Sequence, residues 1–341
     1  MNKGKFIVFG IIISFFVIAL AASLGSTTIS PADTLLIILH KLFRSLPETE
    51  IDPRTVSIVW LLRLPRVLLA FIAGGCLAAS GTVSQSILRN PLATPFILGV
   101  STGASLGAGI IIISGFALPF AGAFTLPLTG FAFGLGTLFL VAAFASKIDK
   151  NISSNTIIIC GMVFSLFLGA VLTTLSAVFS DDLKRIILWQ MGSFAMRGWT
   201  YVQLILPFFV IGTAGVLYYS REMDLLTFGD EQAKSAGVEA GNIRKKLLVF
   251  SAILTGAVVS MSGVIGFVDL IAPHAARKII GSRHKYVIPM SFILGGSLLV
   301  ITDLLARTMI SPSELPVGAL TALIGAPFFA WIYFRRRKTS G

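Results

Sequence analysis

The sequence predicts an all-α integral membrane protein with about ten transmembrane helices, and two observations support this class. Hydrophobic residue types make up 55% of the 341 residues and charged types only 12%, against about 25% charged residues in soluble domains. A soluble fold of this length cannot hide so much apolar surface, which excludes a soluble enzyme, a fibrous repeat and a disordered chain. The apolar stretches are also continuous rather than alternating, and most approach the roughly 20 residues that a helix needs to cross a bilayer.

The first predicted helix covers residues 6–24 and follows Lys3 and Lys5. This segment could also be a signal peptide with a cleavage site at 19–21, but an apolar run of 19 residues is long for one. We therefore expect an uncleaved transmembrane helix. Residues 26–56, which come next, are polar and are expected to lie outside.

The remaining crossings include one short segment. Residues 263–280 are interrupted by Asp269, Pro273 and His274. They are nevertheless needed as a crossing if the basic residues near 277–285 and those at the carboxyl end are to lie on one side of the membrane. The other helices are predicted at 58–88, 96–116, 119–146, 154–179, 201–219, 247–262, 287–306 and 317–334, which makes ten in total.

The positions of Lys and Arg determine the expected orientation, because cytoplasmic loops carry an excess of them. With ten crossings both ends share one side, and a cytoplasmic tail at 335–338 places 18 of the 27 basic residues inside. Topology therefore explains the net charge of +12 better than nucleic-acid binding does. The inner segment 221–246 contains ten charged side chains, and within it residues 231–237 predict a short helix and a turn at Gly237. We interpret this segment as a docking surface, with a solvated loop as the alternative.

A weak internal repeat is present. Ser80-Gly81 precedes Pro91 with the spacing at which Ser262-Gly263 precedes Pro273. The two matched segments would cross in opposite directions, as in the inverted repeats of transporters. Two such short matches can also arise by chance.

Glycines indicate close helix packing. Gly99, Gly103 and Gly107 recur every four residues on one helix face, where the missing side chain lets another backbone approach. Ordinary glycine enrichment of membrane helices would explain a single pair but explains the triplet less well.

The sequence shows no catalytic or metal-binding motif. A G-x-x-x-x-G-K-[ST] phosphate loop, an H-E-x-x-H motif and a G-x-S-x-G motif are all missing. His40, His274 and His284 are scattered, and Cys76 and Cys160 lie in apolar stretches. We expect no catalytic residue, no metal site and no bound cofactor in this chain.

Few ionisable residues lie within or beside the apolar segments, where such groups usually mark an ion pathway. The candidates are Asp269, Asp303 and Glu314. Asp303 is expected to form a structural pair with Arg307 four residues later. Asp269 is expected to pair with a nearby arginine, with exposure to a transport pathway as the alternative.

An ordered set of motifs between residues 63 and 328 resembles the FecCD-type permeases, the membrane subunits of ABC importers for iron-siderophores, haem and cobalamin. One departure is Asp269, where that family usually has glycine. The motifs are Arg63-Leu-Pro-Arg66, Gly74-Gly75, Ser80-Gly81, Arg89-Asn90-Pro91-Leu-Ala-Thr-Pro95 with Gly99, Gly229-Asp230-Glu231 with Ala233 and Gly237, Gly266-Phe-Val268, Pro273-His274 with Arg277, Asp303 with Arg307, Leu315-Pro-Val-Gly318, and Gly325-Ala-Pro-Phe328.

The resemblance implies a single transmembrane permease domain over residues 1–341, folded as the inverted-repeat bundle of a type II ABC importer. It implies a bacterial cytoplasmic membrane protein with both termini in the cytoplasm. Expected partners are a second permease subunit (an identical chain or a close paralogue), two cytoplasmic ATP-binding subunits that use the ATP, and an extracytoplasmic substrate-binding protein. The chain itself would not be an enzyme. The expected cargo is an iron-siderophore complex, with haem or cobalamin as alternatives, because siderophores are the commonest cargo of the family.

The resemblance also implies roles for named residues. ATPase coupling is expected at Gly229, Asp230, Glu231, Ala233 and Gly237. Binding-protein docking is expected at Arg63, Arg66 and Arg307, for which contact with lipid headgroups is the alternative. Helix packing or the pathway is expected to use Gly99, Gly103, Gly107, Asn90, Pro91 and Pro273.

Two other classes of function compete with this interpretation. An ion-coupled secondary carrier would work alone, without ATP. A membrane-anchored assembly protein would transport nothing in any combination.

Overall fold

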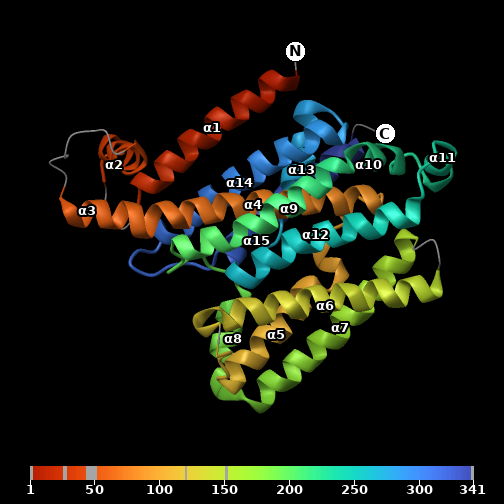
Figure 1. The fold of residues 1–341 in the computed structure, drawn as a ribbon, viewed down its shortest axis with the longest axis horizontal. Coiled ribbons are helices and arrows are strands. Elements are labelled where there is room, and N and C mark those ends of the chain that lie inside the picture. Colours follow the sequence, from red (N-terminus) through yellow and green to blue (C-terminus); the bar gives the residue numbers. More distant parts are fainter. Residues whose placement is uncertain (1–2, 26–28, 44–51, 120, 150–152, 339–341) are drawn as a thin grey trace.

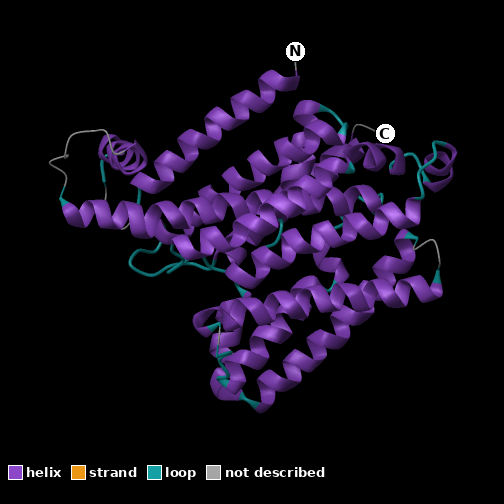
Figure 2. Cartoon of the chain, viewed as in Figure 1, coloured by secondary structure: helices purple, strands orange, loops and turns teal. Residues whose placement is uncertain are grey.

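The computed structural model describes residues 3–25, 29–43, 52–119, 121–149 and 153–338. Over these residues the protein is helical, with turns and loops but no strand (Figure 2). The predicted all-α class is confirmed. Most long helices lie roughly side by side, and α5 to α8 form a second group along one edge of the bundle (Figure 1).

Seven helical segments of the described chain are long and apolar enough to cross a membrane. Three further helices, α5 (Val100–Ser114), α13 (Val268–Ile280) and α15 (Val317–Lys338), account for the other predicted crossings. Each of the ten predicted segments thus contains a helix, but the number of ten crossings stays a prediction. The seven are α1 (Lys3–Ser23), the continuous segment α3 (Pro53–Ser57), η1 (Ile58–Arg63) and α4 (Leu64–Ile87), the segment of η3 (Gly122–Phe124) and α6 (Thr125–Ile148), α7 (Ser154–Val178), α9 (Trp199–Tyr218), α12 (Ala240–Ser262) and α14 (His284–Thr308).

Several short helices join these segments. α11 (Asp230–Ser235) confirms the short helix predicted within the inner loop. The segment 26–56, which the sequence presents as polar, contains α2 (Pro31–Phe43), whose backbone N–H at Ala32 is capped by the Ser30 hydroxyl at 3.2 Å. The other short elements are η2 (Pro95–Leu98), η4 (Ser180–Asp182), α8 (Leu183–Gln190) and α10 (Ser220–Leu226).

Helix α4 lies at the centre of the bundle, packed against α9, α12, α13 and α14. Nearly all of its side chains are buried. Two glycines permit the close packing, because a Cβ atom on Gly81 would overlap the backbone carbonyl of Asp269, and one on Gly74 would overlap that of Gly295. Small residues therefore set the distance from α4 to α13 and α14.

Helix α5 packs against α6 and α7. A Cβ atom on Gly103 or Gly107 would collide with α6, at Thr137 and Phe133 respectively. Gly99 lies just before the helix in the left-handed region, with φ of 79°, and it connects η2 to α5. Gly99 therefore starts the helix, while Gly103 and Gly107 make its close contact.

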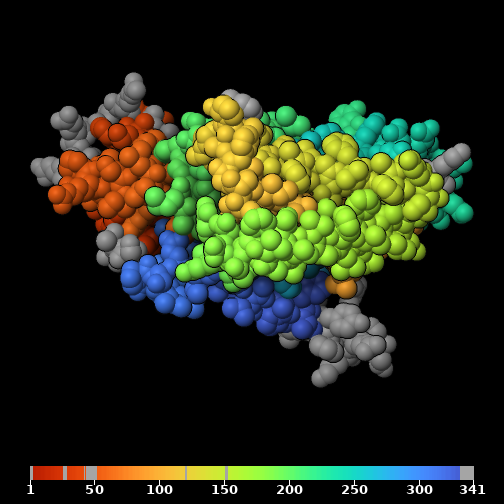
Figure 3. Space-filling view, turned by 90° about the horizontal axis from the view of Figure 1, so that it is seen from below, coloured from red at the N-terminus to blue at the C-terminus, as the bar shows by residue number. Residues whose placement is uncertain are grey.

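One face of the molecule is covered largely by α6 and α7 (Figure 3). Helix α7 exposes large apolar side chains along this face, which suits contact with lipid or with another subunit. These side chains are Ile159, Met162, Val163, Leu166 and Phe167.

Candidate functional site

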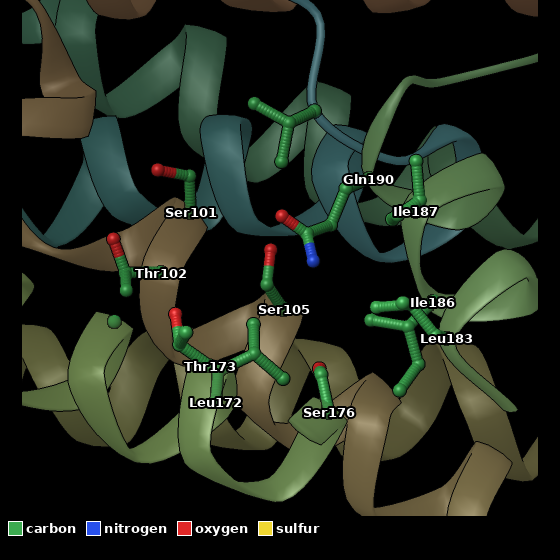
Figure 4. Close-up of a pocket in the computed structure, with 12 residues that line it drawn as sticks. Ser101, Thr102, Ser105, Leu172, Thr173, Ser176, Leu183, Ile186, Ile187 and Gln190 are labelled. Atoms are coloured by element: carbon green, nitrogen blue, oxygen red, sulfur yellow. The ribbon is translucent and has the colours of Figure 1, made fainter. Parts of the chain in front are cut away.

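A cavity of about 450 Å³ lies between α5, α7 and α8, and we call it the hydroxyl groove (Figure 4). Its polar side chains carry hydroxyl or amide groups, and the side chains of Ser105 and Gln190 point into the cavity. Apolar side chains complete the wall, among them Leu172, Leu183 and Ile186. The polar members are Ser101, Thr102 and Ser105 of α5, Thr173 and Ser176 of α7, and Gln190 of α8.

The chemistry of the hydroxyl groove is neutral. None of its lining residues is ionisable, and hydroxyl and amide groups can both donate and accept hydrogen bonds. Such a surface can contact a polar molecule without chelating a metal or selecting a charge. The sequence interpretation missed these residues, although three hydroxyl side chains within five positions of an apolar helix (101, 102 and 105) were a visible signal.

The structure does not bring the predicted pathway residues together. Asn90 and Pro91 line a different cavity. Pro273 is buried within α13. None of these three, and none of the glycines at 99, 103 and 107, is among the described residues that line the hydroxyl groove.

An ion-pair network joins α4 to α14 at the predicted outer side. Arg66 donates from Nη2 to Asp303 Oδ1 at 2.8 Å and from Nη1 to Glu314 Oε1 at 2.7 Å. Asp303 is only 1% exposed, whereas Glu314 is 37% exposed. The predicted pair between Asp303 and Arg307 is present but longer, at 3.7 Å, so Arg66 is the closer partner.

The other two predicted docking arginines hold the carboxyl end of α1. Arg63 donates from Nη1 to the Ser23 carbonyl at 2.5 Å, and Arg307 donates to the Ala21 carbonyl. Both side chains are buried. The last carbonyl groups of a helix lack helical partners and favour a nearby cation. Docking of a binding protein at these arginines stays a prediction, and each guanidinium already has a structural role within the chain.

The predicted coupling residues lie together in the inner segment. Asp230 Oδ1 accepts a hydrogen bond from Arg244 Nη2 at 2.8 Å and lies 3.5 Å from Arg89 Nη2. Arg244 is fully buried in α12. Ala233 is buried, whereas Glu231 faces solvent. The short helix α11 is therefore tied to α12 and to the loop after α4, while part of its surface stays accessible.

Two glycines bound α11, and both require positive φ. Gly229 has φ of 119° and Gly237 has φ of 80°. The turn at Gly237 is closed by hydrogen bonds from Gly237 N to Lys234 O and from Val238 N to Ala233 O, both at 2.9 Å. The turn predicted at Gly237 is confirmed.

A second polar network, which the sequence analysis did not predict, joins the inner ends of α4, α10 and α14. Ser86 Oγ lies 2.5 Å from His284 Nε2, and His284 Nδ1 lies 2.5 Å from Asp224 Oδ1. The backbone N–H of His284 also donates to Asp224 at 2.9 Å. Ser86 and His284 are buried. This network fixes α10, the start of the inner segment, to the bundle.

The Asp224 carboxylate should make stability depend on pH. Burial alone would raise the pKa of Asp224, but the hydrogen bonds from His284 and the charges of His284 and Arg283 outweigh it and hold that pKa below its usual value. A lowered pKa contributes stability at neutral pH that is lost as the pH falls through the folded-state pKa. Below about pH 4, the melting temperature in detergent should decrease as the pH falls. We expect this decrease to be less steep in Asp224→Asn than in the native protein. Parallel curves of melting temperature against pH for the two proteins would contradict this role of Asp224.

Asp269 is fully buried in the first turn of α13. Among the described residues no arginine or other side chain pairs with its carboxyl group. The predicted pairing with a local arginine is therefore wrong, because α13 packs Asp269 into the interior against Gly81 of α4. Asp269 does not line the hydroxyl groove either.

Comparison with known proteins agrees with this architecture. Residues 11–335 match the FecCD transport family. The chain is 42% identical over 287 residues to YvrB, an uncharacterized ABC transporter permease protein of Bacillus subtilis, covering 84% of this chain and 81% of that one. It is 39% identical over 292 residues to HmuU, the hemin transport system permease protein of Yersinia pestis, covering 82% and 84%. An inward-facing metal-chelate type ABC transporter has a similar structure, with a TM-score of 0.83, 30% identity and coverage of 97% and 99%.

Proposed function

This chain belongs to the FecCD transport family and is a permease of a type II ABC importer for chelated metal, haem or cobalamin, and from that premise we propose that its cargo is an iron-siderophore complex. The hydroxyl groove is the observation that carries the proposal. A siderophore already supplies the ligands of its iron, so the pathway needs weak polar contacts and no metal ligands. The groove offers hydroxyl and amide groups without an ionisable side chain.

We propose that the working assembly contains two permease subunits, two cytoplasmic ATPase subunits and an external binding protein. The apolar side chains exposed on α7 provide a surface on which a second subunit can pack. Two grooves would then face one shared passage. Both termini and the segment 221–246 would lie in the cytoplasm, which places α11 on the ATPase side and the Arg66 network on the outer side.

The contacts of α11 suggest how force reaches the bundle. When nucleotide binding closes the ATPase pair, α11 is pushed as a rigid unit. The Asp230 carboxylate transmits this motion to Arg244 on α12 and to Arg89 after α4. Helix α12 contacts α5, and α5 lines the hydroxyl groove. A short chain of contacts therefore joins the ATPase contact to the pathway.

Gly237→Val is expected to abolish uptake while membrane insertion stays normal. A Cβ atom at Gly237 would meet nothing within 4 Å, so the cost comes from the φ of 80° and not from collision. A side chain there costs roughly 1–2 kcal/mol, more for a β-branched residue. Uptake should be measured in proteoliposomes with the ATPase and binding protein. Gly237→Asn should retain more transport because asparagine tolerates this backbone region, and Ala236→Val controls for added bulk. Normal uptake by Gly237→Val would show that the turn is not required.

The cargo is tested by competition in the same proteoliposomes. We expect uptake of a ferric siderophore labelled with radioactive iron, and no displacement of that label by excess cobalamin or hemin. Saturable uptake of hemin or cobalamin, with none of the siderophore, would overturn the cargo assignment and leave the assignment as a permease intact.

A further inference from the structure

A second cavity, of about 700 Å³, opens at the inner ends of α4, α10, α13 and α14, and we call it the basic cavity. Of its lining residues, only Arg89 takes part in the transport mechanism proposed above. Its ionisable lining residues are three arginines, one histidine and one aspartate. These residues are Arg89, Arg277, Arg283, His284 and Asp224.

Two arginines of the basic cavity, Arg277 and Arg283, form no ion pair within the described chain, whereas Arg89 pairs with Asp230. The Asp224 carboxylate is already bound by His284. Arg277 is partly buried and donates to the neutral side-chain oxygen of Gln85. Neither Arg277 nor Arg283 lies within 4.0 Å of an acidic side chain among the described residues. A partly buried guanidinium without a counter-ion is costly, so this arrangement favours binding of an anion.

Neutral donors lie beside these arginines. Asn90 uses Oδ1 to accept a hydrogen bond from the Leu92 N–H at 2.9 Å, which leaves its Nδ2 hydrogens as donors. Ser282 adds a hydroxyl to the same wall. Guanidinium groups together with amide and hydroxyl donors match the several oxygens of a phosphate group, and the arginine fork can bind two of these oxygens at once.

The surroundings of the basic cavity favour a lipid as the source of that phosphate. Phe228, which lines it, is 73% exposed, and Ile279 on the same helix as Arg277 is 41% exposed. Exposed apolar side chains beside clustered arginines suit an acyl chain below a charged headgroup. Basic pockets between transmembrane helices on the cytoplasmic side are known to take such headgroups.

We propose that the basic cavity binds the phosphodiester headgroup of an anionic phospholipid in the cytoplasmic leaflet. Arg277 and Arg283 would bind the phosphate oxygens, and Asn90 and Ser282 would donate to them. The leaflet rests on the orientation proposed above, but headgroup binding itself does not depend on transport. Because the cavity contacts α10 and the loop that carries Arg89, a lipid bound there would stabilise the position of the start of the inner segment.

The test is native mass spectrometry of the full-length chain, in micelles that contain phosphatidylglycerol or phosphatidylcholine. We expect phosphatidylglycerol to be retained preferentially. Arg277→Gln should weaken that retention about tenfold, the loss expected for one charge-assisted contact. Arg283→Gln changes an exposed side chain, so it should weaken retention without affecting folding. Lys147→Gln removes one exposed basic charge at the inner end of α6 and should change nothing.

Three outcomes would overturn the proposal. The first is equal retention of phosphatidylglycerol and phosphatidylcholine. The second is native-like retention by both arginine variants. The third is full displacement of the lipid by millimolar inorganic phosphate, which would assign the cavity to a free anion. Loss of uptake in the transport assay with normal lipid retention would count against the proposed function alone.

Discussion

Replacing Asp303 with alanine is expected to lower the free energy of unfolding by about 3 kcal/mol, because a buried carboxylate that compensates two arginines would be removed. Asp303 is 1% exposed and accepts hydrogen bonds from Arg66 at 2.8 and 3.1 Å. Arg307 lies on the other side of the carboxylate, with 6% of its side chain exposed. This loss of unfolding free energy is at the low end of the range for broken buried ion pairs, because Arg66 retains its hydrogen bond to Glu314. Denaturant titration in mixed micelles measures the free energy of unfolding of the native protein and of the variant.

Glu314→Gln is the matched control for that measurement. Glu314 also binds Arg66, but it is 37% exposed, and exposed ion pairs contribute between 0 and about 1 kcal/mol. We therefore expect a clear difference between the two variants. Equal losses of unfolding free energy in the two variants would contradict the view that Asp303 stabilises the protein because it is buried, and not merely because it forms an ion pair.

Replacing Asp230 with alanine is expected to uncouple ATP hydrolysis from uptake. Arg244, which is fully buried, would lose its ion pair with Asp230, and α11 would lose its ties to α12 and to Arg89. Losing one hydrogen bond between charged groups at a buried donor costs about 2 kcal/mol, which corresponds to roughly a thirtyfold change in the population of correctly placed α11. Uptake and ATP hydrolysis should be measured together in proteoliposomes, and uptake should fall while hydrolysis persists.

A double variant separates the fold of α11 from its charge. Arg244→Met combined with Asp230→Leu replaces the ion pair between the buried Arg244 and the partly exposed Asp230 by apolar side chains, and such a replacement is often neutral for stability. We expect this variant to recover much of the uptake that Asp230→Ala loses. Asp181→Asn, an exposed acidic position in η4, controls for the change of one negative charge. Undiminished uptake by Asp230→Ala would show that this pair does not couple the subunits.

The helical elements could be predicted because their signal is local. Continuous apolar runs need no tertiary information, and each predicted segment contains a helix. The turn at Gly237 was equally visible, since a glycine after a short polar helix is typical of a left-handed turn. Helix α2 was missed because its mixed composition does not distinguish an interfacial helix from a polar loop.

The pairing of charged side chains could not be predicted in the same way. The spacing of four residues indicated Asp303 with Arg307, but the closer partner, Arg66, is 237 residues away in the sequence. The network of Asp224, His284 and Ser86 joins three helices, and its members share no sequence pattern. Only the packing of α4 against α14 brings such groups together.

The same reasoning explains the error at Asp269. An acidic residue in an apolar segment close to arginines suggested a local pair. The packing of α13 on Gly81 instead buries this carboxyl away from every arginine of the described chain. The face of a short helix that becomes buried is determined by the helices that pack against it, and a single sequence does not contain that information.

The central proposal is that this permease works only with a separate ATPase. The direct measurement is uptake of chelated iron into proteoliposomes that contain this chain alone or together with its ATPase subunits, with the binding protein outside and the ATP inside. We expect uptake only when ATPase and ATP are both present, whatever the ion gradient. Uptake by the chain alone, driven by a proton or sodium gradient without ATP, would contradict it.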